Sequence, residues 1–119
     1  MDEDKRVFVH TEFTIESGRL AEFKKIAQEL IDVVEEKEPK TLRYQWYFNK
    51  DRSKCYLVEE YPNAAAVRVH VLHLGLHVRK LLQVSKVTKF TVLGKLILPR
   101  RALTAAGGQN FRYWKGPAR

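Results

Sequence analysis

The residues best suited to chemistry lie between residues 44 and 70. Tyr44 and Trp46 alternate with polar residues on one stretch, Glu59 lies on the next, and His70 falls within an apolar helical pattern. A phenol, an indole, a carboxylate and an imidazole around an apolar cavity can hold an aromatic molecule and exchange a proton with it. Of these groups the imidazole suits the role of base, because its unperturbed pKa of about 6.5 is close to neutrality.

A hairpin is predicted to position three of these groups. Apolar and polar residues alternate over residues 42–48 and again over 55–61, and a polar turn that contains Asp51 and Arg52 separates the two runs. The predicted register pairs Phe48 with Cys55, Trp46 with Leu57, Tyr44 with Glu59, and Leu42 with Tyr61. One face of the hairpin is therefore largely apolar. The opposite face carries Arg43, Gln45, Tyr47, Tyr56, Val58 and Glu60.

Two helical patterns can cover the apolar face. Residues 19–37 carry apolar residues at three- and four-residue steps, with Ser17 as the expected N-cap and Pro39 after the end. A second helix is predicted over residues 64–74, with Asn63 as its N-cap. Gly75 is expected to interrupt it before a short helical piece at residues 76–84. Residues 7–15 and 86–98 are predicted strands, and Gly94 marks a bend in the second of these.

The resulting order, β-α-β-β-α-β, predicts an α+β protein with the ferredoxin-like, split βαβ arrangement. Its sheet would have four antiparallel strands with both helices on one face. We assign residues 1–98 to this domain and residues 99–119 to a C-terminal tail. The tail contains Phe111, Tyr113 and Trp114, and exposed aromatic residues need cover, so we expect it at a homodimer interface. Tyr47 and Tyr56 on the open sheet face would suit a second copy of the chain.

Composition narrows the classes of function. The chain has 119 residues, of which 45% are hydrophobic and 30% charged, as in a single globular domain. It shows no signal peptide and no apolar run of the roughly 20 residues that a membrane helix needs. The single cysteine, Cys55, suits the cytoplasm. The net charge of +8 would fit nucleic acid, but RNP-type aromatics and zinc-ligand spacing are absent, so we expect no nucleic-acid partner and no membrane partner.

The stretch EPKTLRYQWYFNKDRSKCYLVEEYPNAAAVRVHVLHLG, residues 38–75, resembles the antibiotic biosynthesis monooxygenase family. The similar motifs are the strand Leu42–Trp46, the strand end Glu59–Tyr61, the small residues Ala64–Ala66, and His70 five residues before Gly75. Residues 87–94 resemble the last strand of the family. The resemblance covers about residues 7 to 98 and implies a homodimeric, dimeric α+β barrel protein.

What the resemblance implies for function is an oxidoreductase that needs no cofactor. Many family members oxidise quinols, phenols or aromatic polyketides with dioxygen, in a pocket between sheet and helices. A small aromatic molecule would then be the substrate, with His70 as the base that takes a phenolic proton. Trp46 and Tyr44 would orient the aromatic ring. The residues expected to bind the substrate are Thr11, Glu59 and Tyr61, and no metal ligands are expected.

Three alternatives stay open at this point. The same scaffold could bind a small aromatic or hydrophobic ligand without catalysis. A haem-degrading enzyme would need His70 or His77 as an axial ligand, although Gly75 is expected to break the helical register between His73 and His77. Finally, the candidate site residues could be ordinary core residues, with Glu59 paired to an arginine or lysine.

Overall fold

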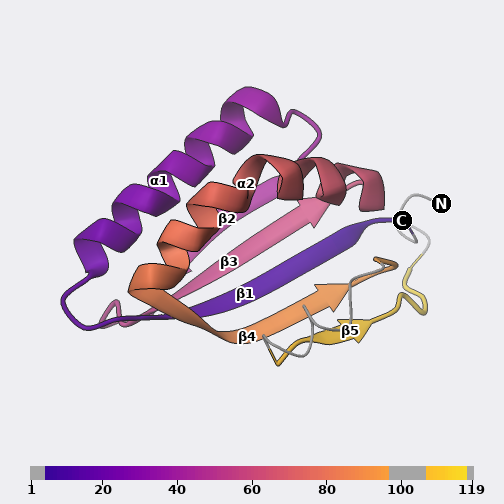
Figure 1. The fold of residues 1–119 in the computed structure, drawn as a ribbon. Helices are drawn as coiled ribbons and strands as arrows, with labels where there is room; N and C mark the ends of the chain where they lie inside the picture. Colours follow the sequence, from indigo (N-terminus) through magenta and orange to yellow (C-terminus); the bar gives the residue numbers. More distant parts are fainter. Residues whose placement is uncertain (1–4, 97–106, 118–119) are drawn as a thin grey trace.

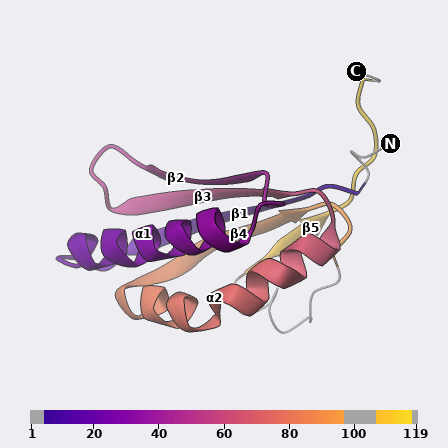
Figure 2. The ribbon, with the colours of Figure 1, turned by 90° about the horizontal axis from the view of Figure 1, so that it is seen from above.

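The computed structural model describes residues 5–96 and 107–117 of the chain, and this part folds into two layers (Figure 1). Both helices lie on one face of a single sheet (Figure 2), and no helix of the described residues lies on the other face, which we call the open face. The ferredoxin-like α+β fold predicted from the sequence is confirmed. In chain order the elements are β1 (Val7–Ile15), α1 (Leu20–Lys37), β2 (Arg43–Phe48), β3 (Lys54–Tyr61), α2 (Ala64–Val84), β4 (Ser85–Leu93) and β5 (Gln109–Phe111).

The sheet has one strand more than predicted. Its strand order is β2-β3-β1-β4-β5, in which the first four strands pair antiparallel and β5 lies parallel to β4. The N–H of Gly94 donates to the carbonyl of Phe111, and the Asn110 side-chain amide donates to the carbonyls of Val92 and Gly94. Part of the predicted tail is thus a strand of the same subunit, because these groups satisfy the free edge of β4.

The hairpin forms with the predicted register. Tyr44 lies opposite Glu59, Trp46 opposite Leu57, and Phe48 opposite Cys55. This register turns one set of side chains toward the helices, because successive side chains of a strand point to opposite faces. The predicted pairing of Leu42 with Tyr61 on the apolar face is wrong, because Leu42 precedes β2 and is 52% exposed.

Helix α1 packs on the sheet through a buried stripe of Phe23, Ala27, Leu30 and Val34. The predicted N-cap Ser17 is wrong. The N-cap position is Arg19, it makes no side-chain cap hydrogen bond, and the guanidinium of Arg19 binds the carboxylate of Glu22 instead.

Helix α2 runs without a break from Ala64 to Val84, so the predicted interruption at Gly75 is wrong. A glycine inside a helix costs only about 1 kcal/mol. The apolar stripe continues past Gly75 to Leu81 and Val84, each 2% exposed, and this burial outweighs the cost. At the start of the helix, the Asn63 side chain accepts a hydrogen bond from the Ala66 N–H, as predicted for an N-cap.

Strand β4 begins one residue earlier than predicted and ends at Leu93 rather than Leu98, and residues 97–98 lie outside the described residues. Gly94 follows with a φ of 108°. A Cβ atom there would lie 2.3 Å from the carbonyl oxygen of Arg6, so only glycine fits where the chain passes this close.

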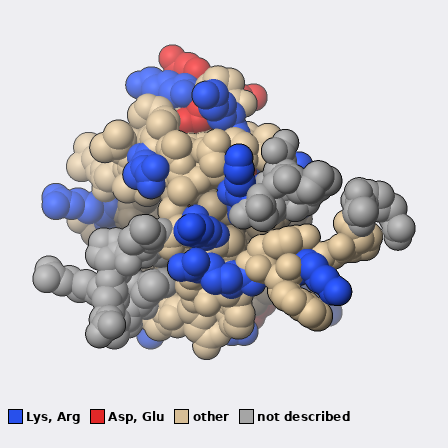
Figure 3. Space-filling model, turned by 90° about the vertical axis from the view of Figure 1, so that its right-hand side faces the viewer, with Lys and Arg blue, Asp and Glu red and all other residues tan. Residues whose placement is uncertain are grey.

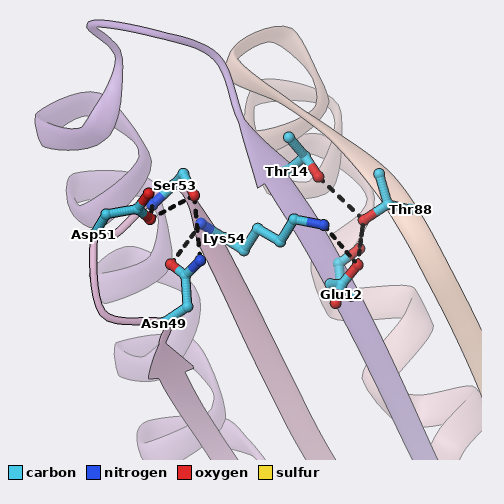
Figure 4. A network of polar contacts seen from close by, with 7 residues as sticks. All are labelled: Glu12, Thr14, Asn49, Asp51, Ser53, Lys54 and Thr88. Carbon is cyan, nitrogen blue, oxygen red and sulfur yellow. Dashed lines mark hydrogen bonds and ion pairs between the residues drawn. The ribbon is translucent and has the colours of Figure 1, made fainter.

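The open face of the sheet carries a network of polar side chains in contact with solvent (Figure 4). Thr88 on β4 donates to Glu12 on β1, and Lys54 on β3 lies 3.6 Å from the same carboxylate. The hairpin turn is closed by Asp51, which accepts from the N–H and hydroxyl of Ser53. Neither α1 nor α2, the helices of the described residues, has the length and apolar character needed to cross a membrane.

Candidate functional site

A cavity of about 280 Å³ lies between the sheet and helix α2, and its walls are almost entirely apolar. Its apolar walls include Phe13, Leu57, Val67, Leu74, Phe90 and Val92. Five of the six site residues predicted from the sequence line this cavity: Thr11, Tyr44, Trp46, Glu59 and His70. The sixth, Tyr61, is fully buried behind it and donates its hydroxyl proton to Glu59.

The hairpin and helix α2 bring the aromatic groups around His70. The ring of Tyr44 lies 5.2 Å from the imidazole, and the ring of Tyr61 lies 5.4 Å from it on the other strand of the hairpin. Trp46 packs edge-on against Tyr44 at 5.6 Å and stacks on Phe13 at 6.0 Å. His70 therefore points toward the hairpin and away from solvent, with only 3% of its surface exposed.

Both nitrogens of the His70 ring face carboxylates. Nδ1 lies 2.7 Å from Oε1 of Glu38, and Nε2 lies 3.3 Å from Oε1 of Glu59. The expectation that Glu59 pairs with an arginine or lysine is therefore wrong, since its partners are His70 and Tyr61. An imidazole between two carboxylates is held most strongly in its doubly protonated, cationic form.

Glu38 is the residue of this site that sequence reasoning missed. It follows the last residue of α1, is 5% exposed, and accepts hydrogen bonds from three side chains: those of His70, His73 and Thr41. In the sequence it ends the charged run Glu35, Glu36, Lys37, which is typical of a solvated helix end. Only its position before Pro39, where the chain must leave the helix, distinguishes it from that run.

The charges of the site shift the pKa values of its members. Burial alone would lower the pKa of His70, but the carboxylates of Glu59 and Glu38 outweigh burial and raise it. Burial alone would raise the pKa of Glu38, but the hydrogen bond from His73 and the charge of His70 outweigh it and lower that pKa. Both shifts favour the ion pair.

The two tyrosines of the site stay neutral. Burial, and next the negative charge of Glu59, raises the pKa of Tyr44 and that of Tyr61. A phenol whose ionisation is opposed in this way can donate a hydrogen bond but does not serve as a base. The groups left to accept a proton from a ligand are therefore the carboxylates joined to His70.

Trp46 offers a free donor. Its indole Nε1 is buried and, among the described residues, has no hydrogen-bond partner. A buried N–H without a partner costs about 1–3 kcal/mol, so it is a place where a ligand oxygen would be stabilised.

A metal or haem site finds little support in the residues described. Within residues 5–96 and 107–117, no group of three or more histidine, cysteine, aspartate or glutamate side chains is arranged to hold a metal ion. Both nitrogens of His70 are already engaged with carboxylates, so it does not fit as an axial haem ligand. His77, the other residue considered for that role, lies 3.8 Å from Glu29.

The sequence matches the antibiotic biosynthesis monooxygenase family over residues 6–73, more than half of the chain, and the protein belongs to this family. The matched region contains every candidate residue named above except His77. No curated protein matches the sequence.

Solved structures with the same fold include that of MupZ from Pseudomonas fluorescens, with a TM-score of 0.79 at 20% identity. That match covers 97% of this chain and 95% of MupZ. SnoaB from Streptomyces nogalater, described as a cofactor-independent oxygenase, gives a TM-score of 0.65 at 18% identity over 80% of this chain and 98% of SnoaB. A conserved protein from Methanosarcina mazei Go1 gives a TM-score of 0.66 at 15% identity, and the match covers 79% of this chain and 96% of that protein. At these identities the likeness establishes the shared fold.

Proposed function

We propose that this protein is a monooxygenase that oxidises a phenol or quinol of aromatic polyketide type with dioxygen, without a flavin or a metal. The observation that carries this proposal is the position of Glu59 and His70, an ion pair set into the wall of an otherwise apolar cavity. Family membership and the description of SnoaB as a cofactor-independent oxygenase support the same class of reaction.

The reaction starts when the phenol loses its proton to the Glu59–His70 pair. The phenolate is electron-rich and gives one electron to dioxygen, and the resulting phenoxyl radical and superoxide combine at the para carbon. The peroxide that forms takes up a proton, the carbon loses its hydrogen as a proton, and the O–O bond breaks to release water. One phenol and one dioxygen thus give one quinone and one water, so atoms and electrons balance without a cofactor.

The side chains around the ligand take different parts in this reaction. Glu59 is the base, since the raised pKa of His70 keeps the imidazole protonated and leaves a carboxylate to take the proton. This differs from the role of sole base that the sequence suggested for His70. The hydrogen bond from Tyr61 and the contact with His70 both go to Oε1 of Glu59, which leaves Oε2 for the ligand. The indole N–H of Trp46 donates to a ligand oxygen.

Oxygen consumption tests the proposal. Purified protein, treated with a chelator, is mixed with hydroquinones, naphthoquinols or anthrones in an oxygen electrode. We expect turnover, and we expect Glu59→Gln to lower it by about 10²-fold or more. Trp46→Phe, which removes the free donor, should cost roughly fivefold, because one hydrogen bond is worth about 1 kcal/mol.

The matched control for Trp46 is its neighbour Tyr47, which points to the open sheet face and donates to Gln45. Tyr47→Phe should leave turnover unchanged. A strict requirement for flavin or iron would overturn the cofactor-free reaction. Binding of these molecules without oxygen uptake would favour the second candidate, a non-catalytic binder, which the largely apolar cavity also fits.

We further propose that the protein is a cytoplasmic homodimer. Tyr47 and Tyr56 are 50% and 38% exposed on the open sheet face, as a contact surface requires, and Cys55 is a buried free thiol, which fits a reducing compartment. The segment after β5 leads away from the two layers (Figure 2), and Trp114 is 84% exposed. A second copy of the chain would cover these aromatic residues.

Truncation tests whether the tail contributes to the dimer interface. Deleting residues 105–119 should weaken dimerisation, measured by sedimentation, if the exposed aromatic residues contact the second copy. An unchanged dissociation constant would show that the tail is not an interface element. A full-length protein that sediments as a monomer at micromolar concentration would overturn the dimer itself.

The charge of the surface suits an anionic or easily ionised ligand. Figure 3 shows lysine and arginine side chains across the middle of the face at the right-hand end of Figure 1, with acidic side chains at its upper edge. The net charge of the chain is +8. Such a field raises the encounter rate with anions and falls with ionic strength, so kcat/KM for acidic phenols should decrease as salt is added.

A further inference from the structure

We propose that Glu59, His70, Glu38 and His73 form a proton conduit that connects the cavity with solvent. The proposed oxidation gives the conduit its use, but its geometry stands independently of that reaction. Glu38 and His73 do not line the cavity, so their role is to carry a proton between His70 and solvent when Glu59 takes one up there.

The four side chains form three consecutive links. Glu59 Oε1 lies 3.3 Å from His70 Nε2, His70 Nδ1 lies 2.7 Å from Glu38 Oε1, and Glu38 Oε2 lies 2.9 Å from His73 Nδ1. The second and third links are within hydrogen-bond range, and the first is slightly longer. Links of this kind are often long in the absence of a ligand and shorten when one binds.

Burial decreases toward one end of the chain of groups. The side chains of Glu38 and His70 are 2% and 4% exposed, whereas that of His73 is 30% exposed. A second cavity, about 250 Å³ in volume, lies beside Glu38 and is lined by the segment from Lys37 to Thr41 and by Ala66 and Val69 of α2. The conduit therefore leads from the apolar cavity, between α1 and α2, to the surface around Pro39.

The chemistry of the links permits transfer in both directions without rotation of a ring. When Glu59 takes up a proton at Oε2 and becomes neutral, the imidazolium of His70 loses one of its two counter-charges and can release its Nδ1 proton to Oε1 of Glu38, while it keeps the proton on Nε2. The carboxyl group of Glu38 then turns and passes this proton to Nδ1 of a neutral His73, so that one proton enters at Glu59 and one leaves at His73. The reverse sequence returns one. The titratable groups that face His70 are Glu38 from the segment after α1, Glu59 and Tyr61 from β3, and Tyr44 from β2. The two phenols are neutral, so the two carboxylates carry the transfer.

In the proposed oxidation the conduit lets one proton leave the buried site when Glu59 takes the phenolic proton. When Glu59 later gives its proton to the peroxide, which leaves as water, the conduit returns one proton to Nδ1 of His70. The buried site therefore gains no net positive charge while dioxygen reacts.

A purely structural role for these residues is the competing explanation, since the same bonds tie the end of α1 to α2. Proton exchange distinguishes the two explanations. In protein labelled with ¹⁵N at histidine, the rate at which the buried Nδ1 proton of His70 exchanges with water is measured by saturation transfer. We expect His73→Gln to slow this exchange by roughly tenfold or more, in line with the loss of a general acid–base group, and imidazole in solution to restore it.

His77 supplies the matched control, because it lies on the same helix, is similarly part-exposed and contacts Glu29 instead of Glu38. His77→Gln should leave the exchange rate of His70 unchanged. Equal exchange in the wild type and His73→Gln, including exchange too fast to observe in both, would overturn the conduit. Thermal unfolding checks that both variants are folded, and Glu38→Gln should give the same slow exchange if His73→Gln is unstable.

A second measurement starts from the cavity. When 4-nitrophenol binds and ionises, the absorbance of the phenolate reports transfer to Glu59, and an indicator dye in unbuffered solution reports release to solvent. In the wild type, proton release to solvent should be as fast as ionisation of the bound 4-nitrophenol. In His73→Gln, proton release should be slower than ionisation, and the final amount of phenolate should be the same. Simultaneous release in both proteins, or no ionisation at all, would overturn the conduit. Neither measurement uses dioxygen, so an absence of quinol oxidation would refute the proposed function and leave this result standing.

Discussion

Two polar networks of this protein, each built on glutamate carboxylates, lie on opposite sides of one sheet. On the open face, Glu12 joins Lys54 and Thr88 across three strands (Figure 4). On the covered face, His70 joins Glu38 to Glu59. The first network is in contact with water and the second is not, and this difference decides what each one can do.

Burial makes the inner network costly and therefore informative. Charges taken out of water lose several kcal/mol of hydration each, and only well-placed partners offset the loss. The pair of Glu12 and Lys54 stays in contact with solvent, with side chains 18% and 47% exposed, so it loses less hydration. Such pairs are typically worth about 0–1 kcal/mol. Networks of the outer kind occur on most protein surfaces. A buried carboxylate–imidazole–carboxylate arrangement beside an apolar cavity is expected where a proton must be moved.

The largest expected effect is on stability. Glu38→Gln removes the carboxylate that holds two histidines, one of them buried, and should lower the free energy of unfolding by about 3 kcal/mol. Denaturant unfolding followed by circular dichroism measures it. Glu12→Gln is the matched control on the open face and should change the same quantity by less than about 1 kcal/mol. Similar losses in the two variants would mean that burial does not separate the networks.

The importance of Glu38 could not be predicted from the sequence, whereas much of its surroundings could. The hairpin register follows from period-two alternation, which is a local property. This alternation predicts Tyr44, Trp46 and Glu59 on one face, and the structure confirms it. Whether a carboxylate at a helix end is buried depends on what packs there from elsewhere in the chain. Glu38 is buried by α2, a contact between residues more than thirty positions apart, and no local pattern encodes it.

Two features of the fold that the sequence predicts wrongly also depend on contacts with distant parts of the chain. Gly75 has a low helix propensity, yet nothing lies within 4 Å of the position of a Cβ there, and burial of the flanking residues keeps the helix whole. The strand β5 is only three residues long and has no alternation of its own. It forms because the edge of β4 offers backbone partners, which a reading of residues 109–111 alone does not reveal.

A smaller effect should appear in the dependence of stability on pH. The pKa of His70 is raised in the folded state, so its contribution is fully present below the unfolded value of about 6.5 and is lost as pH rises through the folded pKa. Each unit of raised pKa corresponds to about 1.4 kcal/mol. Urea unfolding between about pH 6 and 8, below the range where cysteine and tyrosine ionise, should show this fall in the wild type and a flatter curve in His70→Gln.

The stability at acid pH depends on carboxylates of both networks, so the acid part of this pH profile tests the two networks together. The pKa of Glu38 is lowered, and so is that of Glu12, chiefly by the hydrogen bond from Thr88. Stability contributed by these carboxylates is present above their unfolded pKa values and is lost as pH falls through the folded ones. Glu38→Gln should remove the larger part of the loss. A profile without an alkaline decline would contradict the protonated state of His70 on which the proposed base rests.

The smallest effect is expected on the open face, and it sets the scale for the comparison. A double-mutant cycle of Glu12→Gln and Lys54→Met measures the coupling between two side chains that lie 3.6 Å apart in contact with solvent. We expect a coupling below about 1 kcal/mol, because water screens the pair and ordering the lysine side chain costs entropy. The coupling should fall further as salt is added, since the Debye length shrinks to about 3 Å at 1 M. A salt-insensitive coupling as large as the Glu38 effect would show that this network is shielded from water, for instance beneath a second copy of the chain, and the contrast between the two faces would then hold only for the isolated subunit.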